Sequence, residues 1–133
     1  MNKDEMLQLR NWAIIGVTPK KDRYGYKIWR QMKEKGYTVY GVNPNYEEID
    51  GEKIFASLQN ISEPIDAIDI IIGPSHVPPI LEAAREKGIR NLFFQPGSYD
   101  REIIEMAEEM GFNYIEGDCV YASLLRKDYQ ICD

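Results

Sequence analysis

The sequence predicts a three-layer α/β domain, in which a mostly parallel sheet of about five strands has helices on both faces. Short apolar runs alternate along the chain with longer segments whose apolar residues recur at helical spacing. Charged residues, then a glycine, then the apolar start of a strand occur together at 33–37, 85–89 and 108–112. A glycine in that place ends a helix in the left-handed conformation. Strands that are joined by crossover helices run parallel, and the helices cover both faces of the sheet.

Four elements are expected in the first third of the chain: a short helix over 4–10, a buried strand over 11–15, a helix over 24–35 and a strand over 37–42. The second helix carries Ile28, Trp29 and Met32 at helical spacing, and Gly36 follows it as a stop. Pro44 closes the second strand, because the residue before a proline avoids the helical region.

The rest of the chain alternates in the same way. Polar, turn-like residues over 45–51 precede a weaker region over 52–61, in which we expect a short edge strand and one helical turn. Three strands and two helices then follow: strands over 67–72, 91–94 and 112–115, and helices that begin near Pro78 and Asp100. Proline is tolerated in the first turn of a helix, and aspartate is a side chain that caps helix N-termini.

Length and composition limit the class of protein. With 133 residues the chain is expected to form a single domain over 1–133. Its net charge of −6 leaves no broad basic face, so nucleic acid is not an expected partner. The N-terminal segment lacks the apolar core of a signal peptide, and no apolar run is long enough to span a membrane. Cys119 and Cys132 form no metal-binding pattern, so we expect a cytoplasmic protein without a metal site.

The segment after the first strand combines a glycine, a short polar loop and the start of a helix. In a βαβ unit this order presents a helix N-terminus to a phosphate group. The loop and the first turns of the helix carry five cations against one acid: Lys20, Lys21, Arg23, Lys27 and Arg30 against Asp22. Cations oppose the helix dipole at this end, so their presence in an acidic chain favours a bound polyanion.

Each expected strand exit is built from small, turn-forming or amide residues. The exits are Gly16-Val17-Thr18-Pro19, Val42-Asn43-Pro44, Gly73-Pro74-Ser75 and Gln95-Pro96-Gly97. In parallel sheets ligands bind beyond the carboxyl ends of the strands, and small residues let the backbone approach them. Glycine and proline also end strands that bind nothing, so a purely structural role stays open for each exit taken alone.

The motifs narrow the choice of nucleotide. Gly16 is not followed by the further glycines of a GxGxxG fingerprint, and Asn43 takes the place of the acid that holds a ribose diol in NAD-binding domains. The P-loop pattern GxxxxGK[ST] is absent. These patterns favour a nucleotide whose phosphates lie at the first loop and whose adenine or ribose rests on Asn43-Pro44. The cations of the loop suit a ligand with more phosphate charge than NAD.

Several of these segments resemble a known family. They are Ile15-Gly16-Val17-Thr18-Pro19, Gly36-Tyr37-Thr38-Val39 and the most specific one, Val42-Asn43-Pro44-Asn45-Tyr46-Glu47-Glu48. The later pieces agree: 57–58, 61–66, 74–77 and 95–97. Over about 11–120 the sequence is similar to the stand-alone CoA-binding domain family, which is related to the nucleotide-binding domain of the succinyl-CoA synthetase alpha subunit.

The resemblance implies a Rossmann-like domain that holds coenzyme A or an acyl-CoA. By position it implies a phosphate loop of Gly16, Val17, Thr18 and Pro19, with Lys20, Arg23 and Gly25 beside it. The adenosine end would be flanked by Val42, Asn43 and Pro44, and the opposite wall would consist of Gly73, Pro74, Ser75 and Val77. Gln95 and Gly97 would lie toward the pantetheine. The sequence departs from the family pattern in three places. Val17-Thr18 replaces the commoner Ala-Ser pair, Tyr24 is bulkier than the small residue often found there, and Asp118 stands where the family has a basic residue.

The interpretation that we favour is a CoA-binding protein with no catalytic constellation of its own, which acts as a sensor, a carrier or an accessory to an acyl-CoA enzyme. Whether the chain is itself an enzyme is left open. The alternative is a small NAD(P)-binding oxidoreductase or a component of an acyl-CoA ligase, and a scaffold that has lost its ligand is a third. His76 is interpreted as a loop or capping residue, and Cys119 as a small core residue or as the partner of the CoA thiol in a mixed disulfide. A homo-oligomer or a partner enzyme is compatible with this interpretation.

Overall fold

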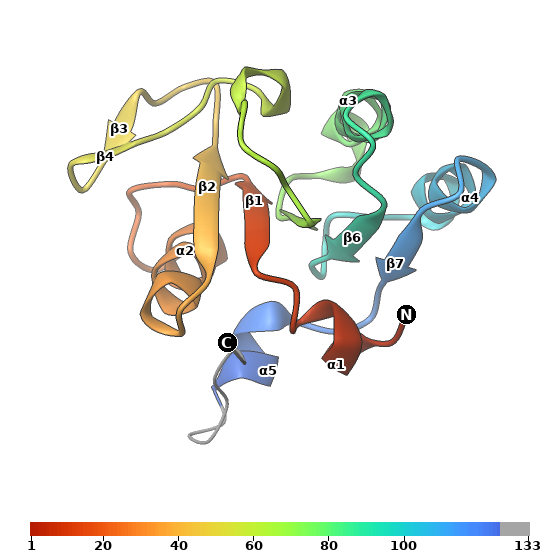
Figure 1. Ribbon diagram of the computed structural model, residues 1–133, viewed down its shortest axis with the longest axis horizontal. Helices are drawn as coiled ribbons and strands as arrows, with labels where there is room; N and C mark the ends of the chain where they lie inside the picture. Colours follow the sequence, from red (N-terminus) through yellow and green to blue (C-terminus); the bar gives the residue numbers. More distant parts are fainter. Residues whose placement is uncertain (126–133) are drawn as a thin grey trace.

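Five parallel strands form the central sheet in the computed structural model, which describes residues 1–125. The strands are β1 (Asn11–Ile15), β2 (Thr38–Val42), β5 (Ala67–Ile70), β6 (Asn91–Phe94) and β7 (Asn113–Ile115), in the order β2-β1-β5-β6-β7 (Figure 1). The helices are α1 (Lys3–Met6), α2 (Tyr24–Glu34), α3 (Pro78–Glu86), α4 (Arg101–Glu109) and α5 (Val120–Leu124). A separate antiparallel hairpin consists of β3 (Glu48–Ile49) and β4 (Glu52–Lys53), and 3₁₀ turns lie at η1 (Leu58–Asn60) and η2 (Pro74–His76). The predicted α/β fold with its parallel sheet is confirmed.

The order of the strands reverses between β1 and β5. From β1 the chain passes outward to β2, and it then returns across β1 to β5, from which it continues to β6 and β7. Ile15, at the end of β1, therefore lies opposite both Val42 of β2 and Ile70 of β5. In open parallel sheets the crevice at such a reversal is where ligands bind.

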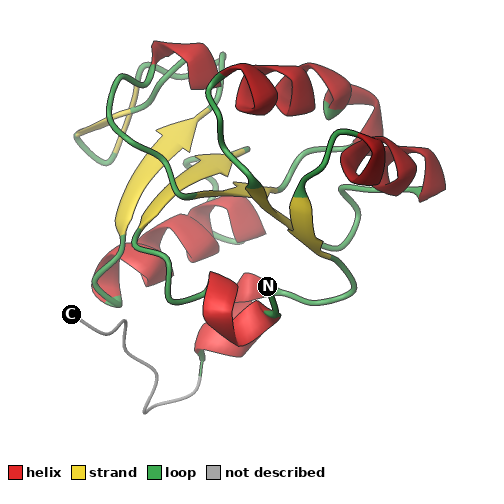
Figure 2. Cartoon of the chain, turned by 45° about the vertical axis from the view of Figure 1, so that its right-hand side comes forward, coloured by secondary structure: helices red, strands yellow, loops and turns green. Residues whose placement is uncertain are grey.

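Helices cover both faces of the sheet (Figure 2). On one face α2 packs together with α1 and α5, and Trp29 and Val120 meet Ile14 of β1 in a single apolar cluster. On the other face α3 and α4 form a second cluster, in which Leu81 meets Ile68 of β5. Both tryptophans of the chain are buried, as the sequence predicts.

The predicted helix ends are confirmed in their local geometry. Gly36, Gly88 and Gly111 have φ angles of 98°, 76° and 81°, which is the left-handed conformation that favours glycine at a helix end. Asp100 caps α4, because its carboxylate accepts a hydrogen bond of 2.9 Å from the Ile103 amide.

Four segments differ from the sequence-based expectation. α1 ends at Met6 rather than at residue 10, the strand expected over 67–72 ends at Ile70, the turn-like stretch 45–51 contains β3, and no sequence pattern predicts α5. Strands of two residues and a helix of five span too few positions for a periodic pattern to appear, so contacts with the rest of the fold determine them. Cys132 lies outside the described residues.

Candidate functional site

The carboxyl end of β1 and the N-terminus of α2 meet in direct backbone contact. Gly16 has a φ angle of 110°, and its amide donates a hydrogen bond of 3.0 Å to the carbonyl of Val42. A Cβ added at Gly25, in the first turn of α2, would lie 2.2 Å from the carbonyl oxygen of Gly16. Only glycine fits at position 25, and its presence brings the start of α2 against the end of the strand.

The N-terminus of α2 has no side-chain cap. Arg23 occupies the cap position without a side-chain hydrogen bond to the backbone, and no acidic residue lies in the first turn. Within the described residues, no carboxylate forms an ion pair with Lys20, Lys21 or Arg23. Free amides at a helix start, with unpaired cations beside them, are arranged to hold an anion.

Two hollows lie at the carboxyl edge of the sheet, and Gly16 lines both. We call the first the cationic hollow: it has a volume of about 430 Å³ and is lined by Gly16, Thr18, Lys20, Arg23, Tyr24, Gly25 and Ile71. We call the second the neutral hollow: it also has a volume of about 430 Å³ and is lined by Ile15, Gly16, Val42, Asn43, Pro44, Asn45, Ala56, Ser57, Leu58, Gln59, Ile72, His76, Pro79 and Ile80. No lysine, arginine, aspartate or glutamate lines the neutral hollow.

The predicted site residues are divided between these hollows and their surroundings. Eight of them line a hollow: Gly16, Thr18, Lys20, Arg23, Gly25, Val42, Asn43 and Pro44. The side chains of Val17 and Val77 are fully buried in the two apolar clusters, so these residues could reach a ligand only through their backbone. The remaining six line neither hollow: Pro19, Gly73, Pro74, Ser75, Gln95 and Gly97.

The neutral hollow also contains residues that sequence reasoning missed. One of its walls consists of Ser57, Leu58 and Gln59. They come from the region for which the sequence predicts a short edge strand and one helical turn. An isolated parallel bridge between Val42 and Phe55 brings this segment alongside the end of β2. The sequence signal for this wall is weak, because the contact depends on a pairing between distant residues.

The Asn43 side chain joins two of the strand exits. Its Nδ2 donates a hydrogen bond of 2.8 Å to the carbonyl of Val17, and its Oδ1 accepts one of 2.8 Å from the amide of Asn45. Both ends of the amide are therefore occupied within the protein. Asn43 fixes the distance between the exits of β1 and β2, and so it shapes the space for a ligand.

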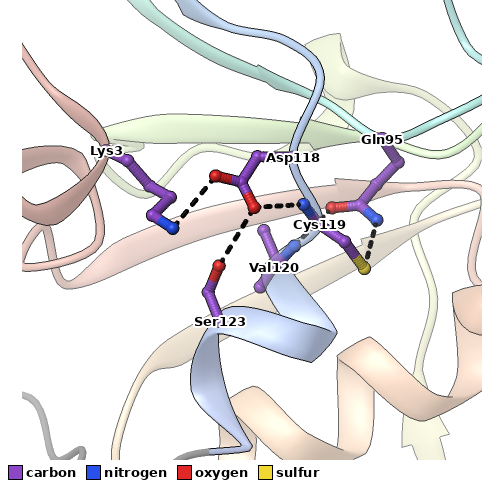
Figure 3. Close-up of polar contacts among 6 residues, drawn as sticks. All are labelled: Lys3, Gln95, Asp118, Cys119, Val120 and Ser123. Atoms are coloured by element: carbon purple, nitrogen blue, oxygen red, sulfur yellow. Dashed lines mark hydrogen bonds and ion pairs between the residues drawn. The ribbon is translucent and has the colours of Figure 1, made fainter.

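The exit of β6 is tied to the start of α5 (Figure 3). Gln95 is buried, its Nε2 donates to Cys119 Sγ at 3.2 Å, and its Oε1 accepts from the amide of Val120 at 2.8 Å. Cys119 itself is half-buried and belongs to neither apolar cluster, so its interpretation as a core residue is wrong. Both polar atoms of the Gln95 amide therefore bind the segment that begins α5.

Asp118 is part of the same network (Figure 3). It lies 2.9 Å from the Lys3 ammonium group, and it accepts a hydrogen bond of 2.9 Å from the Cys119 amide. Partial burial disfavours its charge, but the hydrogen bonds from Lys3 and Cys119 outweigh this and lower the pKa of Asp118. The acid found in place of the family's basic residue therefore anchors α1 to α5.

The described part of the chain contains neither a candidate metal site nor a candidate membrane-spanning helix. Residues 1–125 contain no group of three or more histidine, cysteine, aspartate or glutamate side chains that could hold a metal ion. None of the helices in this range is both long enough and apolar enough to cross a bilayer.

A family model for the CoA binding domain matches residues 10–124. The chain belongs to the CoA-binding domain family. The resemblance seen in the sequence is thereby confirmed. The close contact of Gly16 with Gly25 at the start of α2 is consistent with a phosphate-bearing ligand.

Curated relatives of this CoA-binding domain fall into two groups. It is 30% identical over 116 residues to an ADP-forming acetate–CoA ligase of Methanocaldococcus jannaschii, an alignment that covers 81% of this chain and 16% of the ligase. It is 26% identical to the uncharacterized protein YneT of Bacillus subtilis, with 89% of this chain and 87% of YneT covered. The chain thus spans about a sixth of the ligases of Methanocaldococcus jannaschii and Archaeoglobus fulgidus, and most of YneT.

Solved structures share the fold. A conserved hypothetical protein of Pyrococcus furiosus superposes with a TM-score of 0.81 at 32% identity, over 86% of this chain and 99% of the other. A hypothetical protein of Pyrococcus horikoshii gives a TM-score of 0.83 at 30% identity, over 90% and 84% of the two chains. The Rossmann-like arrangement of the CoA-binding domain is therefore confirmed.

Proposed function

We propose that this domain binds CoA or an acyl-CoA across the two hollows, with the phosphates in the cationic hollow and the adenosine in the neutral hollow. The observation that carries this proposal is the position of Gly16, which lines both hollows at the reversal of strand order. A ligand that crosses Gly16 can approach its backbone because glycine has no side chain, and the phosphates of the ligand then lie beside the uncapped start of α2.

The lining of the neutral hollow suits an adenosine. Pro44, Ile72 and Ile80 offer apolar surface to a flat base, and Asn45 and Gln59 add amide groups that can hydrogen-bond to its edge. Because no lysine or arginine lines this space, it favours a phosphate group less than the cationic hollow does. The division between an uncharged and a cationic hollow thus matches the two chemical halves of a nucleotide.

The exit of β2 supports CoA over NAD as the ligand. A dinucleotide site uses a carboxylate at this place to hold the ribose diol, whereas this chain has Asn43 and Pro44. Lys20 and Arg23 line the cationic hollow without an acidic partner among the described residues. This positive charge suits a ligand with an additional phosphate group.

The relatives support a role as an accessory to an acyl-CoA enzyme. The ligases are several times longer than this chain, so the parts that the chain does not match would supply the chemistry. A component of an ADP-forming acyl-CoA ligase is the second candidate, because the chain also matches 28% of a ligase II alpha subunit from Pyrococcus furiosus at 27% identity. Acyl-CoA formation by the purified chain alone would favour catalysis over an accessory role.

A thermal-shift panel tests the proposed ligand. The protein is first freed of any retained ligand, and it is then heated with CoA, acetyl-CoA, 3′-dephospho-CoA, NAD, NADP or ATP. A ligand at 100 times its Kd adds about 2.7 kcal/mol to the free energy of unfolding, which raises the Tm by roughly 5–10 °C. We expect a shift with CoA and acetyl-CoA, and a smaller one with 3′-dephospho-CoA.

Other outcomes of the panel would contradict the proposal. A shift with NAD alone would indicate a redox cofactor and overturn the assignment of CoA. No shift with any of the six compounds, for protein shown to be free of ligand, would favour a scaffold that binds none of them.

A further inference from the structure

Asp69 is an acidic residue in the middle of the sheet that the proposed site does not use. It lies in β5, opposite Ile14 of β1 and Phe93 of β6. Its side chain is fully buried, and neither carboxylate oxygen has a hydrogen-bond partner. An ionised carboxylate without a partner is strongly disfavoured in such surroundings, whereas the neutral acid is tolerated.

The Asp69 carboxyl group points to the face of the sheet that carries α2 and α5. Side chains alternate along a strand, and Ile68 and Ile70 belong to the apolar cluster of the opposite face. Ile14 and Phe93, the cross-strand neighbours of Asp69, both belong to the cluster formed with α2 and α5. Apolar side chains therefore enclose this carboxyl group.

The cationic hollow lies directly beyond Asp69 along the strands. Gly16 and Ile71, which line this hollow, follow Ile14 and Asp69 by two positions each. Two residues of a strand span about 7 Å, so an anion in the hollow would lie on the order of 10 Å from the carboxyl group. At that separation inside a protein, repulsion between two like unit charges changes a binding constant by about tenfold.

We propose that Asp69 makes ligand binding proton-dependent, because the phosphate groups bind preferentially to the form of the protein in which this carboxyl group is neutral. The inference rests on the proposed function, since it requires phosphate groups in the cationic hollow. Burial raises the pKa of Asp69 well above its ordinary value. Ionisation of Asp69 at higher pH therefore weakens binding, and bound ligand in turn holds the proton on the carboxyl group.

Other titratable groups lie on the elements around this region. Tyr26, Tyr37, Tyr46 and Tyr121 belong to the apolar cluster of this face or pack against it, Lys20, Arg23 and Tyr24 line the cationic hollow, and Asp118 and Cys119 precede α5. Their titration, like that of the ligand, is common to the wild type and to a variant at position 69. The ratio of the two affinities at each pH therefore isolates the Asp69 carboxyl group.

Calorimetric titration with CoA tests the inference, using the wild type, Asp69→Asn and the matched control Asp66→Asn. Asp66 lies just before β5 at the opposite end of the sheet, where it accepts a hydrogen bond of 2.9 Å from the Asn11 amide. From about pH 6 to about pH 9 we expect the affinity of the wild type to fall relative to Asp69→Asn, by about tenfold in total. Asp66→Asn should keep the wild-type profile.

Proton uptake gives a second measurement that needs no variant. Titrations in buffers of different ionisation enthalpy should show that the wild type takes up protons when CoA binds at alkaline pH, and that Asp69→Asn takes up fewer. Asp69→Val also removes the charge, and it replaces Asp69→Asn if that variant does not fold.

Two results separate this inference from the proposed function. A constant ratio of the wild-type and Asp69→Asn affinities across the pH range, or wild-type binding at alkaline pH without proton uptake, would overturn the role of Asp69 and leave CoA binding intact. If neither protein binds CoA at any pH, the proposed function itself is wrong, and this inference fails with it.

Discussion

The two hollows that meet at Gly16 are similar in volume and different in chemistry. The cationic hollow combines Lys20 and Arg23 with the uncapped start of α2, whereas the neutral hollow is lined by apolar side chains, amide and hydroxyl groups and the imidazole of His76. Charge acts over several ångströms and is screened by salt, while packing against a flat base acts only at contact. The first hollow should therefore set the strength of phosphate binding, and the second should select the nucleoside.

Asp69 adds a further contrast between the hollows. Its carboxyl group lies behind the cationic hollow, on the face of the sheet that carries α2. The neutral hollow is lined by Ile72 and Ile80 near α3, on the other face. Changes of pH that ionise Asp69 should thus act on the phosphate half of the ligand more than on the adenosine half.

The largest expected effect comes from removing the backbone contact that forms the cationic hollow. In Gly25→Ala the new Cβ would have to displace the carbonyl of Gly16, so we expect the free energy of unfolding to fall by about 3 kcal/mol and CoA binding to be lost. Gly73→Ala is the control, because a Cβ at Gly73 meets no atom within 4 Å and its φ angle is −66°. Chemical denaturation compares the two, and a Gly25→Ala variant as stable as the wild type would contradict the close contact.

The pH dependence of stability is the next largest effect. The pKa of Asp69 is raised in the folded state, so its stabilising contribution is complete below the unfolded pKa of about 3.9 and is lost as the pH rises toward the folded value. The loss is at most about 1.4 kcal/mol per pH unit. Urea denaturation across this pH range should show that the free energy of unfolding of the wild type falls as the pH rises, and that it falls less steeply in Asp69→Asn. Equal slopes in both proteins would show that the carboxyl group is already ionised or solvated.

Removing charge from the cationic hollow should have a smaller effect, and one that salt reduces. We expect Lys20→Ala/Arg23→Ala to weaken CoA binding by about tenfold at low ionic strength, and by less at high ionic strength. The control Arg85→Ala/Arg101→Ala removes the same charge from α3 and α4, away from both hollows. Calorimetry at two salt concentrations measures both variants. A loss of affinity that is independent of salt would indicate a structural role for these side chains.

Filling the neutral hollow should give the smallest effect. Ala56 lines it and is exposed, so Ala56→Phe can place a ring in the space proposed for the base without disturbing the core. We expect about a fivefold loss of affinity for CoA and for 3′,5′-ADP, roughly 1 kcal/mol, with an unchanged dependence on salt. Ala122→Phe, at an exposed position of α5, is the control. Unchanged binding by Ala56→Phe would place the adenosine elsewhere.

The two hollows also differ in how far they could be predicted. The cationic hollow is almost continuous in sequence, since six of its seven lining residues fall within 16–25, and the glycine, the cations and the helix start can be recognised together. The neutral hollow is assembled from four separate segments (15–16, 42–45, 56–59 and 72–80), and the pairing of Val42 with Phe55 that brings the third into place leaves no periodic signal. Local patterns therefore predict the cationic hollow, and tertiary contacts determine the neutral hollow.

The elements of the fold also differ in whether local sequence or distant contacts determine them. Helix ends at Gly36 and Gly88 depend on the conformation of a single residue, so the sequence predicts them well. The position of α5 depends on the buried Gln95, which binds both Cys119 and the Val120 amide. A side chain that reaches across 25 residues of sequence cannot be recognised from local spacing.

The most direct test of the account is an amide NMR titration of this 15.4 kDa protein with CoA and, separately, with 3′,5′-ADP. We predict that CoA shifts the amide signals of Gly16, Tyr24 and Gly25 together with those of Gln59 and Ile72, which line the two hollows. The shorter ligand should shift the same residues. Shifts confined to α4 or β7, or the absence of any shift at saturating CoA, would contradict binding across Gly16.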